Sequence, residues 1–198
     1  MMVKICGITN SEDALAAIAG GAAALGFNFY PGSPRYIDPD AAASIIDRLP
    51  AGIWKVGVFV NESPDRITDI AARARLDVAQ LHQAGRAVRL SNLRIWQAAQ
   101  VHTGFRLADI DQLDVEAVLL DTPSGAAHGG TGRAFDWTKA AGPTTMKIIL
   151  AGGLDAGNVR EAIAAVHPWG VDACSRIESS PGRKDHAKMA QFLKEATT

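Results

Sequence analysis

The sequence of 198 residues has only two cysteines, Cys6 and Cys174, which lie far apart in the chain. No Cys-x-x-Cys pair occurs, and no Cys/His cluster has the spacing of zinc ligands, so we expect no metal site. No apolar run approaches the roughly 18 residues that cross a membrane. We expect no signal peptide, because residues 1–4 lead straight into a strand and a charged loop. We therefore expect a cytoplasmic protein.

The sequence also lacks an excess of charge of either sign. Its net charge is -1, which gives no electrostatic reason to expect binding to nucleic acid or to a membrane. Hydrophobic residues make up 47% and charged residues 21%, the balance of an ordinary soluble protein. A chain of this length can bury a large core without disulfides, and we expect residues 1–198 to form one domain.

Short apolar runs recur along the chain, and the first of them is followed by a loop of special interest. Residues 2–6 (MVKIC) read as a strand in which Lys4 and Cys6 share one face. Gly7 ends this strand, and Asn10 or Ser11 can cap the helix that follows. Cys6 thus lies where a strand meets a strand-to-helix loop. The alternative is that Cys6 is a small buried hydrophobe, as most free cysteines are.

Seven further strands are predicted, and helical patterns separate most of them. The strands are expected at residues 23–29, 53–60, 77–82, 93–101, 115–121, 146–151 and 170–174. The run at 93–101 fits a strand or a helix by composition, and its Ile, Trp and Val favour a strand. Eight strands alternating with roughly eight helices predict a closed (β/α)8 (TIM) barrel. The alternative, a doubly wound open sheet, lacks its glycine fingerprint after the first strand.

In such a barrel the carboxyl ends of all strands face one site. The candidate residues at these ends are Cys6, Arg35, His82, Asp121, Gly130, Thr131, Gly132, Gly152, Gly153, Ser175 and Arg176. Glycine-bearing or small-residue loops follow strands six, seven and eight, as in a phosphate site built from backbone N–H groups. The alternative is that these glycines only form tight turns.

Two of these residues suggest proton transfer. Asp121 ends an apolar strand, where a carboxylate is costly unless it is paired or functional. A thiolate at Cys6 and a carboxylic acid at Asp121, facing each other across one site, could move protons. Arg35 can bind a carboxylate, or be a solvated loop cation. His82 can bind substrate, or be a hydrogen-bonding residue at the edge of the core.

Eight motifs, in order along nearly the whole chain, resemble those of the phosphoribosylanthranilate isomerases of tryptophan biosynthesis. They are 4–9 (KICGIT), 29–36 (FYPGSPRY), 56–60 (VGVFV), 80–82 (QLH), 119–122 (LLDT), 129–132 (GGTG), 150–154 (LAGGL) and 171–178 (VDACSRIE). The resemblance implies an Amadori rearrangement of N-(5-phosphoribosyl)anthranilate to 1-(2-carboxyphenylamino)-1-deoxyribulose 5-phosphate. It implies that the reaction needs neither a metal nor an organic cofactor. It also implies that the partner is a small-molecule phosphosugar substrate, not nucleic acid or a membrane, and that the chain is a monomer or homodimer.

The resemblance also assigns roles to residues. It implies that Cys6 is the general base, that Asp121 is the general acid and that Arg35 holds the anthranilate end. Asp121 must then keep its proton near neutral pH, which burial favours. Lys4, one pleat below Cys6, lowers the pKa of the thiol and needs a buried partner. We expect that partner to be Asp172, since strand eight neighbours strand one in a closed barrel.

The sequence departs from the family pattern in three places. Gln83 stands where glycine is usual, the segment 84–101 is short, and Cys174-Ser175-Arg176 replaces Ser-Ser-Gly. We expect ordinary negative φ at Arg176 and a side chain that points to solvent. Two rival functions are the related isomerase of histidine biosynthesis and an inactive phosphate-binding barrel. The first uses a carboxylate where Cys6 stands, and the second would lose Cys6 or Asp121.

Overall fold

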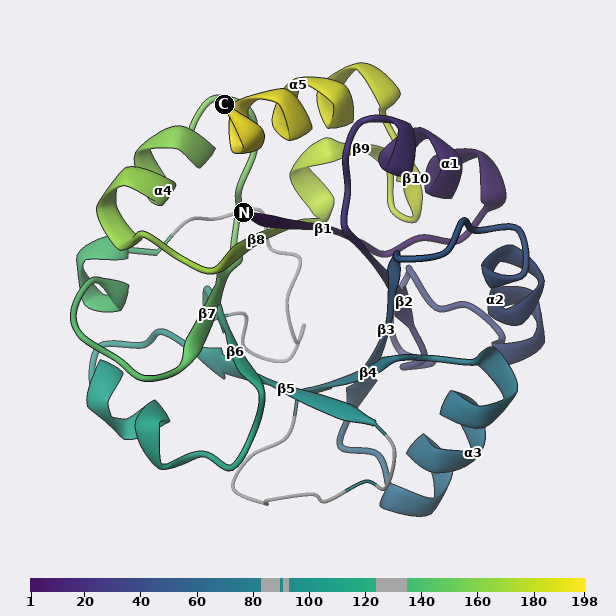
Figure 1. The fold of residues 1–198 in the computed structure, drawn as a ribbon, viewed down its shortest axis with the longest axis horizontal. Helices are drawn as coiled ribbons and strands as arrows, with labels where there is room; N and C mark the ends of the chain where they lie inside the picture. Colours follow the sequence, from purple (N-terminus) through teal and green to yellow (C-terminus); the bar gives the residue numbers. More distant parts are fainter. Residues whose placement is uncertain (83–89, 91–92, 124–134) are drawn as a thin grey trace.

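The computed structural model describes residues 1–82, 90, 93–123 and 135–198, and its eight parallel strands close into a barrel in chain order (Figure 1). The strands are β1 (Met2–Cys6), β2 (Ala24–Asn28), β3 (Trp54–Val60), β4 (Val78–His82), β5 (Arg94–Gln100), β6 (Ala117–Asp121), β7 (Lys147–Leu150) and β8 (Gly170–Ala173). Because β8 pairs with β1, every strand has two neighbours. The predicted TIM barrel is confirmed, and the open sheet is excluded.

The described residues form five α-helices, and these lie outside the ring of strands (Figure 1). They are α1 (Ser11–Ala19), α2 (Pro39–Ile46), α3 (Pro64–Ala74), α4 (Val159–Val166) and α5 (His186–Thr197). Their starts follow the sequence signals, since Asn10 accepts from the Asp13 N–H at 2.8 Å and Pro39 opens α2 behind its cap Asp38.

Two of the described connections hold a short helical turn in place of an α-helix. After β5 and β6 the described residues contain only the 3₁₀ helices η1 (Leu107–Gln112) and η3 (Trp137–Ala140). In η1, Leu107 and Ile110 are three residues apart and both pack on the core. This spacing matches the three-residue turn of a 3₁₀ helix, and the segment is too short to continue.

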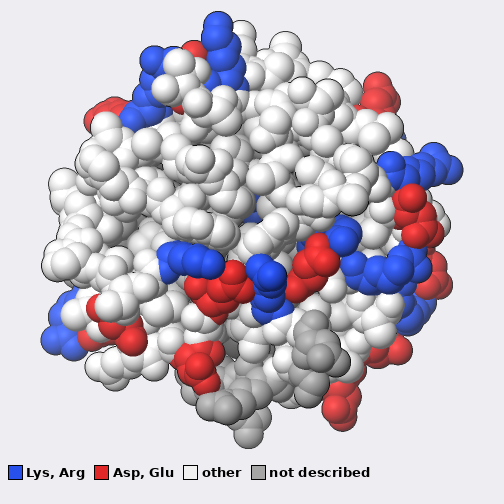
Figure 2. Space-filling model, in the orientation of Figure 1, with Lys and Arg blue, Asp and Glu red and all other residues white. Residues whose placement is uncertain are grey.

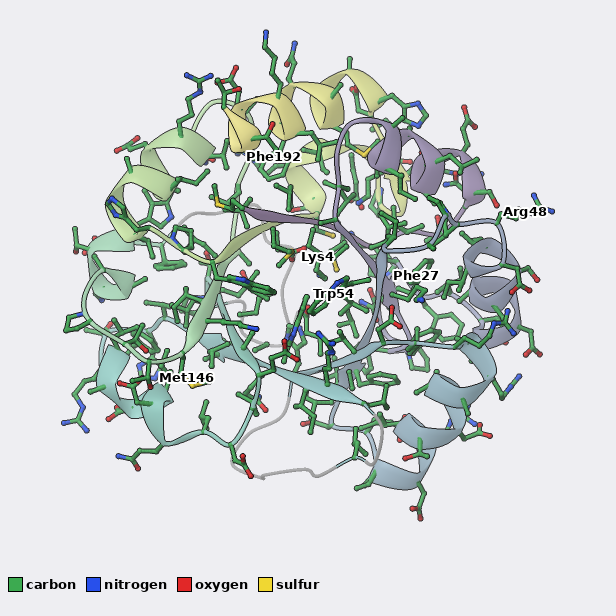
Figure 3. The ribbon with its side chains drawn as sticks, in the orientation of Figure 1. Lys4, Phe27, Arg48, Trp54, Met146 and Phe192 are labelled. Carbon is green, nitrogen blue, oxygen red and sulfur yellow. The ribbon has the colours of Figure 1, made fainter. Side chains whose placement is uncertain are left out.

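Aromatic rings fill the amino-terminal end of the barrel. The rings of Trp54 and Trp96 lie 5.6 Å apart, and that of Trp169 lies 6.0 Å from each. Figure 3 shows Trp54 directed into the ring of strands, as Lys4 is. Arg94 stacks over Trp54 at 4.5 Å and Lys147 over Trp169 at 4.9 Å. The three indole rings therefore fill the barrel interior at this end, although a pocket lined in part by Trp54 and Arg94 opens on the surface beside them.

Ion pairs surround this aromatic cluster. Glu116 pairs with Lys147 at 3.0 Å and with Arg94 at 3.5 Å, and Lys55 pairs with Asp77 at 3.0 Å. Figure 2 shows basic and acidic side chains alternating in a band across one face of the molecule. Alternation of this kind leaves little net field over that face.

An element that the sequence did not predict lies between β8 and α5. The 3₁₀ turn η4 (Ser175–Ile177) leads into a small antiparallel hairpin of β9 (Glu178–Ser180) and β10 (Arg183–Lys184). Strands of two or three residues show no alternation that a sequence pattern can reveal. Among the described residues, no helix combines the length and the apolar character needed to cross a bilayer.

Candidate active site

The site begins with a buried ion pair inside the barrel. Lys4 on β1 is fully buried, and its Nζ lies 2.9 Å from Oδ1 of Asp172 on β8. The strand register places these two residues directly opposite each other, so the pairing predicted from sequence is confirmed. Burial lowers the pKa of Lys4, but the charges of Asp172 and Cys6 outweigh this and raise it. Lys4 is therefore a permanent cation beneath the strand ends.

Cys6 lies one pleat above Lys4, at the carboxyl end of β1, and its side chain is buried. A hydrogen bond from the Cys174 thiol lowers the pKa of Cys6 well below its ordinary value, and Lys4 and Lys184 add to this effect against the cost of burial. A thiolate that is stabilised in this way can accept a proton.

Asp121, at the end of β6, is perturbed in the opposite direction. Burial raises the pKa of Asp121 to about 6, although the Thr122 N–H donates to its Oδ1 at 2.7 Å. The negative charge of Cys6 contributes to the same increase in pKa. One rim thus carries a sulfur that favours its deprotonated form and a carboxyl group that favours its protonated form.

A pocket lies beside these groups and encloses about 340 Å³ of space, part of it open to solvent. It is lined by Asp121, Ala151, Gly152, Gly153, Leu154, Asp172, Cys174, Ser175 and Arg176. Four of the residues predicted for the site line this pocket along with Asp121, namely Gly152, Gly153, Ser175 and Arg176. The predicted residues Gly130, Thr131 and Gly132 lie outside the described residues.

The two glycines after β7 are required by the backbone. Gly152 and Gly153 have φ of +82° and +65°, which is the region that glycine adopts most easily. A Cβ on Gly152 would also meet the side chain and the N–H of Thr122. Asn158 holds the turn by donating to the Gly153 carbonyl at 2.9 Å. The tight turn expected as an alternative is present, and it places backbone beside Asp121.

Arg176 differs in part from the expectation. Its φ lies outside the positive region, which agrees with the prediction, because Arg176 belongs to the 3₁₀ turn η4. Its side chain does not simply point to solvent, however, since Nε donates to Oδ2 of Asp155 at 2.8 Å. The guanidinium of Arg176 is about half exposed, with 47% of the side chain accessible. This ion pair ties the loop after β8 to the loop after β7.

Arg35 is held by a carboxylate that the sequence analysis missed. Its Nε lies 3.0 Å from Oε1 of Glu178, and its Nη2 lies 2.7 Å from Oε2. Lys184 donates to the same carboxylate at 2.8 Å. Burial raises the pKa of Glu178, but Arg35 and Lys184 together hold it below its ordinary value. Arg35 is therefore a half-buried cation that is fixed by Glu178.

The Arg35 side chain packs closely against Gly7, in the loop after β1. Gly7 has φ of +74°, and a Cβ there would lie 2.8 Å from Cδ of Arg35. Since Glu178 occupies the Nε–Nη2 edge of the guanidinium, the Nη1 edge is the one left for a second carboxylate.

His82, at the end of β4, is the last of the predicted residues. Its Nε2 lies 3.0 Å from Nε2 of Gln80, two residues earlier on the same face of the strand. A bond from the Gln80 amide to this nitrogen requires a neutral imidazole with its proton on Nδ1. The bond fits the hydrogen-bonding role given as the alternative, and substrate binding by His82 stays a prediction.

The fold and site define a TIM-barrel enzyme whose acidic and basic groups meet at the carboxyl ends of the strands. A model of the family N-(5'phosphoribosyl)anthranilate (PRA) isomerase matches residues 3–195. The chain therefore belongs to the PRA isomerase family.

Individual relatives agree with this assignment. The chain is 53% identical over 194 residues to the N-(5'-phosphoribosyl)anthranilate isomerase of Solibacter usitatus, covering 98% of this chain and 96% of the relative. The crystal structure of phosphoribosyl anthranilate isomerase from Thermotoga maritima is similar at a TM-score of 0.87 and 38% identity, over 99% of this chain and 98% of that one. A second structure holds reduced 1-(o-carboxyphenylamino)-1-deoxyribulose 5-phosphate and is similar at a TM-score of 0.81 and 36% identity, over 99% and 98% of the two chains.

Proposed function

We propose that this chain isomerises N-(5-phosphoribosyl)anthranilate to 1-(2-carboxyphenylamino)-1-deoxyribulose 5-phosphate in tryptophan biosynthesis, with Cys6 as general base and Asp121 as general acid. The observation that carries the proposal is the opposite perturbation of these two groups above the Lys4–Asp172 ion pair. A pair of titratable groups whose pKa values are pushed apart is the usual arrangement for acid and base roles.

The reaction needs one proton donated and one removed. Asp121, protonated, donates to the ring oxygen as the bond from that oxygen to C1 breaks, which leaves a Schiff base between C1 and the anthranilate nitrogen. The positive charge on this nitrogen acidifies the hydrogen on C2. The Cys6 thiolate takes that proton, and the resulting enolamine becomes the ketone by tautomerisation. No electrons are gained or lost.

Recognition of the substrate is assigned to its two anionic ends. The Nη1 edge of Arg35 suits the anthranilate carboxylate, since Glu178 already neutralises the Nε–Nη2 edge. The phosphate is assigned to the loops after β7 and β8, where Gly152, Gly153 and Ser175 line the pocket. Gly130, Thr131 and Gly132 remain assigned to the same phosphate on sequence grounds.

The test is to measure turnover by the loss of substrate fluorescence in wild type, Cys6→Ala and Asp121→Asn. Each variant should lose at least about a hundredfold in kcat with KM changed little, since a positioned acid or base contributes this much. An exposed carboxylate, replaced in Asp109→Asn, is the matched control and should leave both constants unchanged. Near-normal turnover by Cys6→Ala would return Cys6 to the role of a buried hydrophobe.

The pH profile provides a second test of the same roles. Activity should fall at low pH as Cys6 becomes protonated. The value of kcat/KM should also fall above about pH 6, where Asp121 loses its proton in the free enzyme. A profile without this basic limb would contradict the assignment of Asp121.

A further inference from the structure

The second cysteine of the chain lies directly beside the first. The paired register of β1 and β8 ends with Ile5 opposite Ala173, and Cys6 and Cys174 are the next residues along the two segments. Cys6 shares the inward face of β1 with Lys4. A hydrogen bond links the side chains of Cys6 and Cys174, so the two sulfur atoms lie side by side.

Neighbouring strands lie about 4.8 Å apart, which is within the separation of α-carbons that a disulfide can span. The two side chains also have room to approach, because glycines flank them. A Cβ on Gly26 would lie 2.8 Å from Sγ of Cys6, and a Cβ on Gly7 would lie 3.1 Å from Sγ of Cys174. Both cysteines are free thiols in this structure.

The two sulfurs are chemically unequal. Their mutual hydrogen bond lowers the pKa of Cys6 and raises the pKa of Cys174, and the Cys174 sulfur also lies 4.0 Å from Oε1 of Glu178. Cys6 is therefore the nucleophilic thiolate and Cys174 is the neighbouring thiol. Cys174 also lines the pocket, which gives a small polar oxidant a route to the pair. This division between an attacking and a resolving sulfur is the one that thiol oxidation requires.

We propose that Cys6 and Cys174 form a modification site for hydroperoxides, in which the two thiols are converted reversibly to a disulfide. The Cys6 thiolate attacks one oxygen of hydrogen peroxide, the O–O bond breaks, and a sulfenic acid and hydroxide are formed. The Cys174 sulfur then attacks the sulfenic sulfur and the S–O bond breaks. The thiol proton of Cys174 neutralises the leaving hydroxide. The proton that Cys6 released on ionising neutralises the hydroxide of the first step, so two thiols and one peroxide give one disulfide and two waters.

The disulfide can form whether or not the proposed function is correct. The effect of the disulfide on activity, however, rests on the proposed function. If Cys6 is the general base, its sulfur is blocked in the disulfide, and turnover should fall by about a hundredfold or more. Reduction with dithiothreitol should restore it. The same residue is then both the site of proton transfer and the site of oxidation.

The test treats the reduced full-length protein with hydrogen peroxide and follows the intact mass and the free-thiol count. We expect the loss of two hydrogens, a fall from two free thiols to none, and a cross-linked peptide pair containing Cys6 and Cys174. In Cys174→Ser no internal disulfide can form, so dimedone should trap the Cys6 sulfenic acid. Longer exposure of this variant to peroxide should cause a loss of activity that dithiothreitol does not reverse. Each protein is compared with its own reduced activity.

Three outcomes would overturn the proposal. The first is a dimedone adduct that forms on wild type to the same extent as on Cys174→Ser. The second is a non-reducing gel that shows a disulfide only between two chains. The third is a free-thiol count that peroxide leaves unchanged. An internal disulfide that leaves turnover intact would support this site while contradicting the proposed role of Cys6 as base. The two proposals can therefore fail separately.

Discussion

The raised pKa of Asp121 has a consequence for stability that can be measured without any substrate. An acid whose pKa is higher in the folded chain than in the unfolded chain destabilises the fold wherever it is ionised. Raising the pKa from 3.8 to about 6 corresponds to about 3 kcal/mol, at 1.36 kcal/mol for each pKa unit. This amount is an upper estimate, because Asp121 is only partly shielded from solvent.

Asp121→Asn removes the ionisation but keeps the oxygen that accepts from the Thr122 N–H. Below about pH 4 the carboxyl group is protonated in both folded and unfolded chains, so the two proteins should differ by a constant amount. Between about pH 4 and pH 6 the unfolded chain loses its proton first, and wild type should weaken relative to the variant. Above about pH 6 the variant should have gained up to about 3 kcal/mol in free energy of unfolding.

The assay is urea unfolding of both proteins at a series of pH values from 4 to 8, with the difference in free energy plotted against pH. Asp109→Asn is the matched control, because the Arg106 side chain lowers the pKa of Asp109, which is therefore ionised in both states above about pH 4, and its difference should stay flat across this series. A difference for Asp121→Asn that stays flat, or that favours wild type as pH rises, would refute the raised pKa and with it the case for Asp121 as the acid.

Three further substitutions test other parts of the site. Lys4→Met should destabilise the fold by about 3–5 kcal/mol, measured by urea unfolding at pH 8, because it leaves a buried carboxylate without its cation. Arg176→Gly should change KM by less than about threefold and leave kcat unchanged, because the half-exposed ion pair with Asp155 is worth under about 1 kcal/mol. A tenfold rise in KM would show instead that the guanidinium binds phosphate. Glu178→Gln should raise KM more than it lowers kcat, because Arg35 loses its fixed orientation, and an unchanged KM would contradict a role in binding.

The sequence predicted best where regular spacing determines position. All eight strands were placed to within two residues at each end, because apolar runs of this kind are separated by clear turn signals. The Lys4–Asp172 pair followed from the same logic, since alternation sets the face and ring closure sets the neighbouring strand. Even β5, which fits a helix by composition, was correctly predicted as a strand.

What the sequence did not predict depends on contacts between irregular segments. Glu178 lies in a three-residue strand and reaches Arg35 from a distance of 143 residues in the chain. Asp155 and Arg176 belong to successive loops, where no periodicity relates one position to the other. Charged residues in the last loops thus form specific pairs whose partners only the folded backbone determines.

The aromatic cluster formed by Trp54, Trp96 and Trp169 has a kinetic consequence. These rings occupy the amino-terminal end, so a ligand of the pocket enters and leaves through the opposite end. A product molecule that has not yet departed then occupies the same opening through which, in the described part of the chain, the next substrate enters. Product inhibition should follow a purely competitive pattern, in which an excess of substrate restores the full maximal rate.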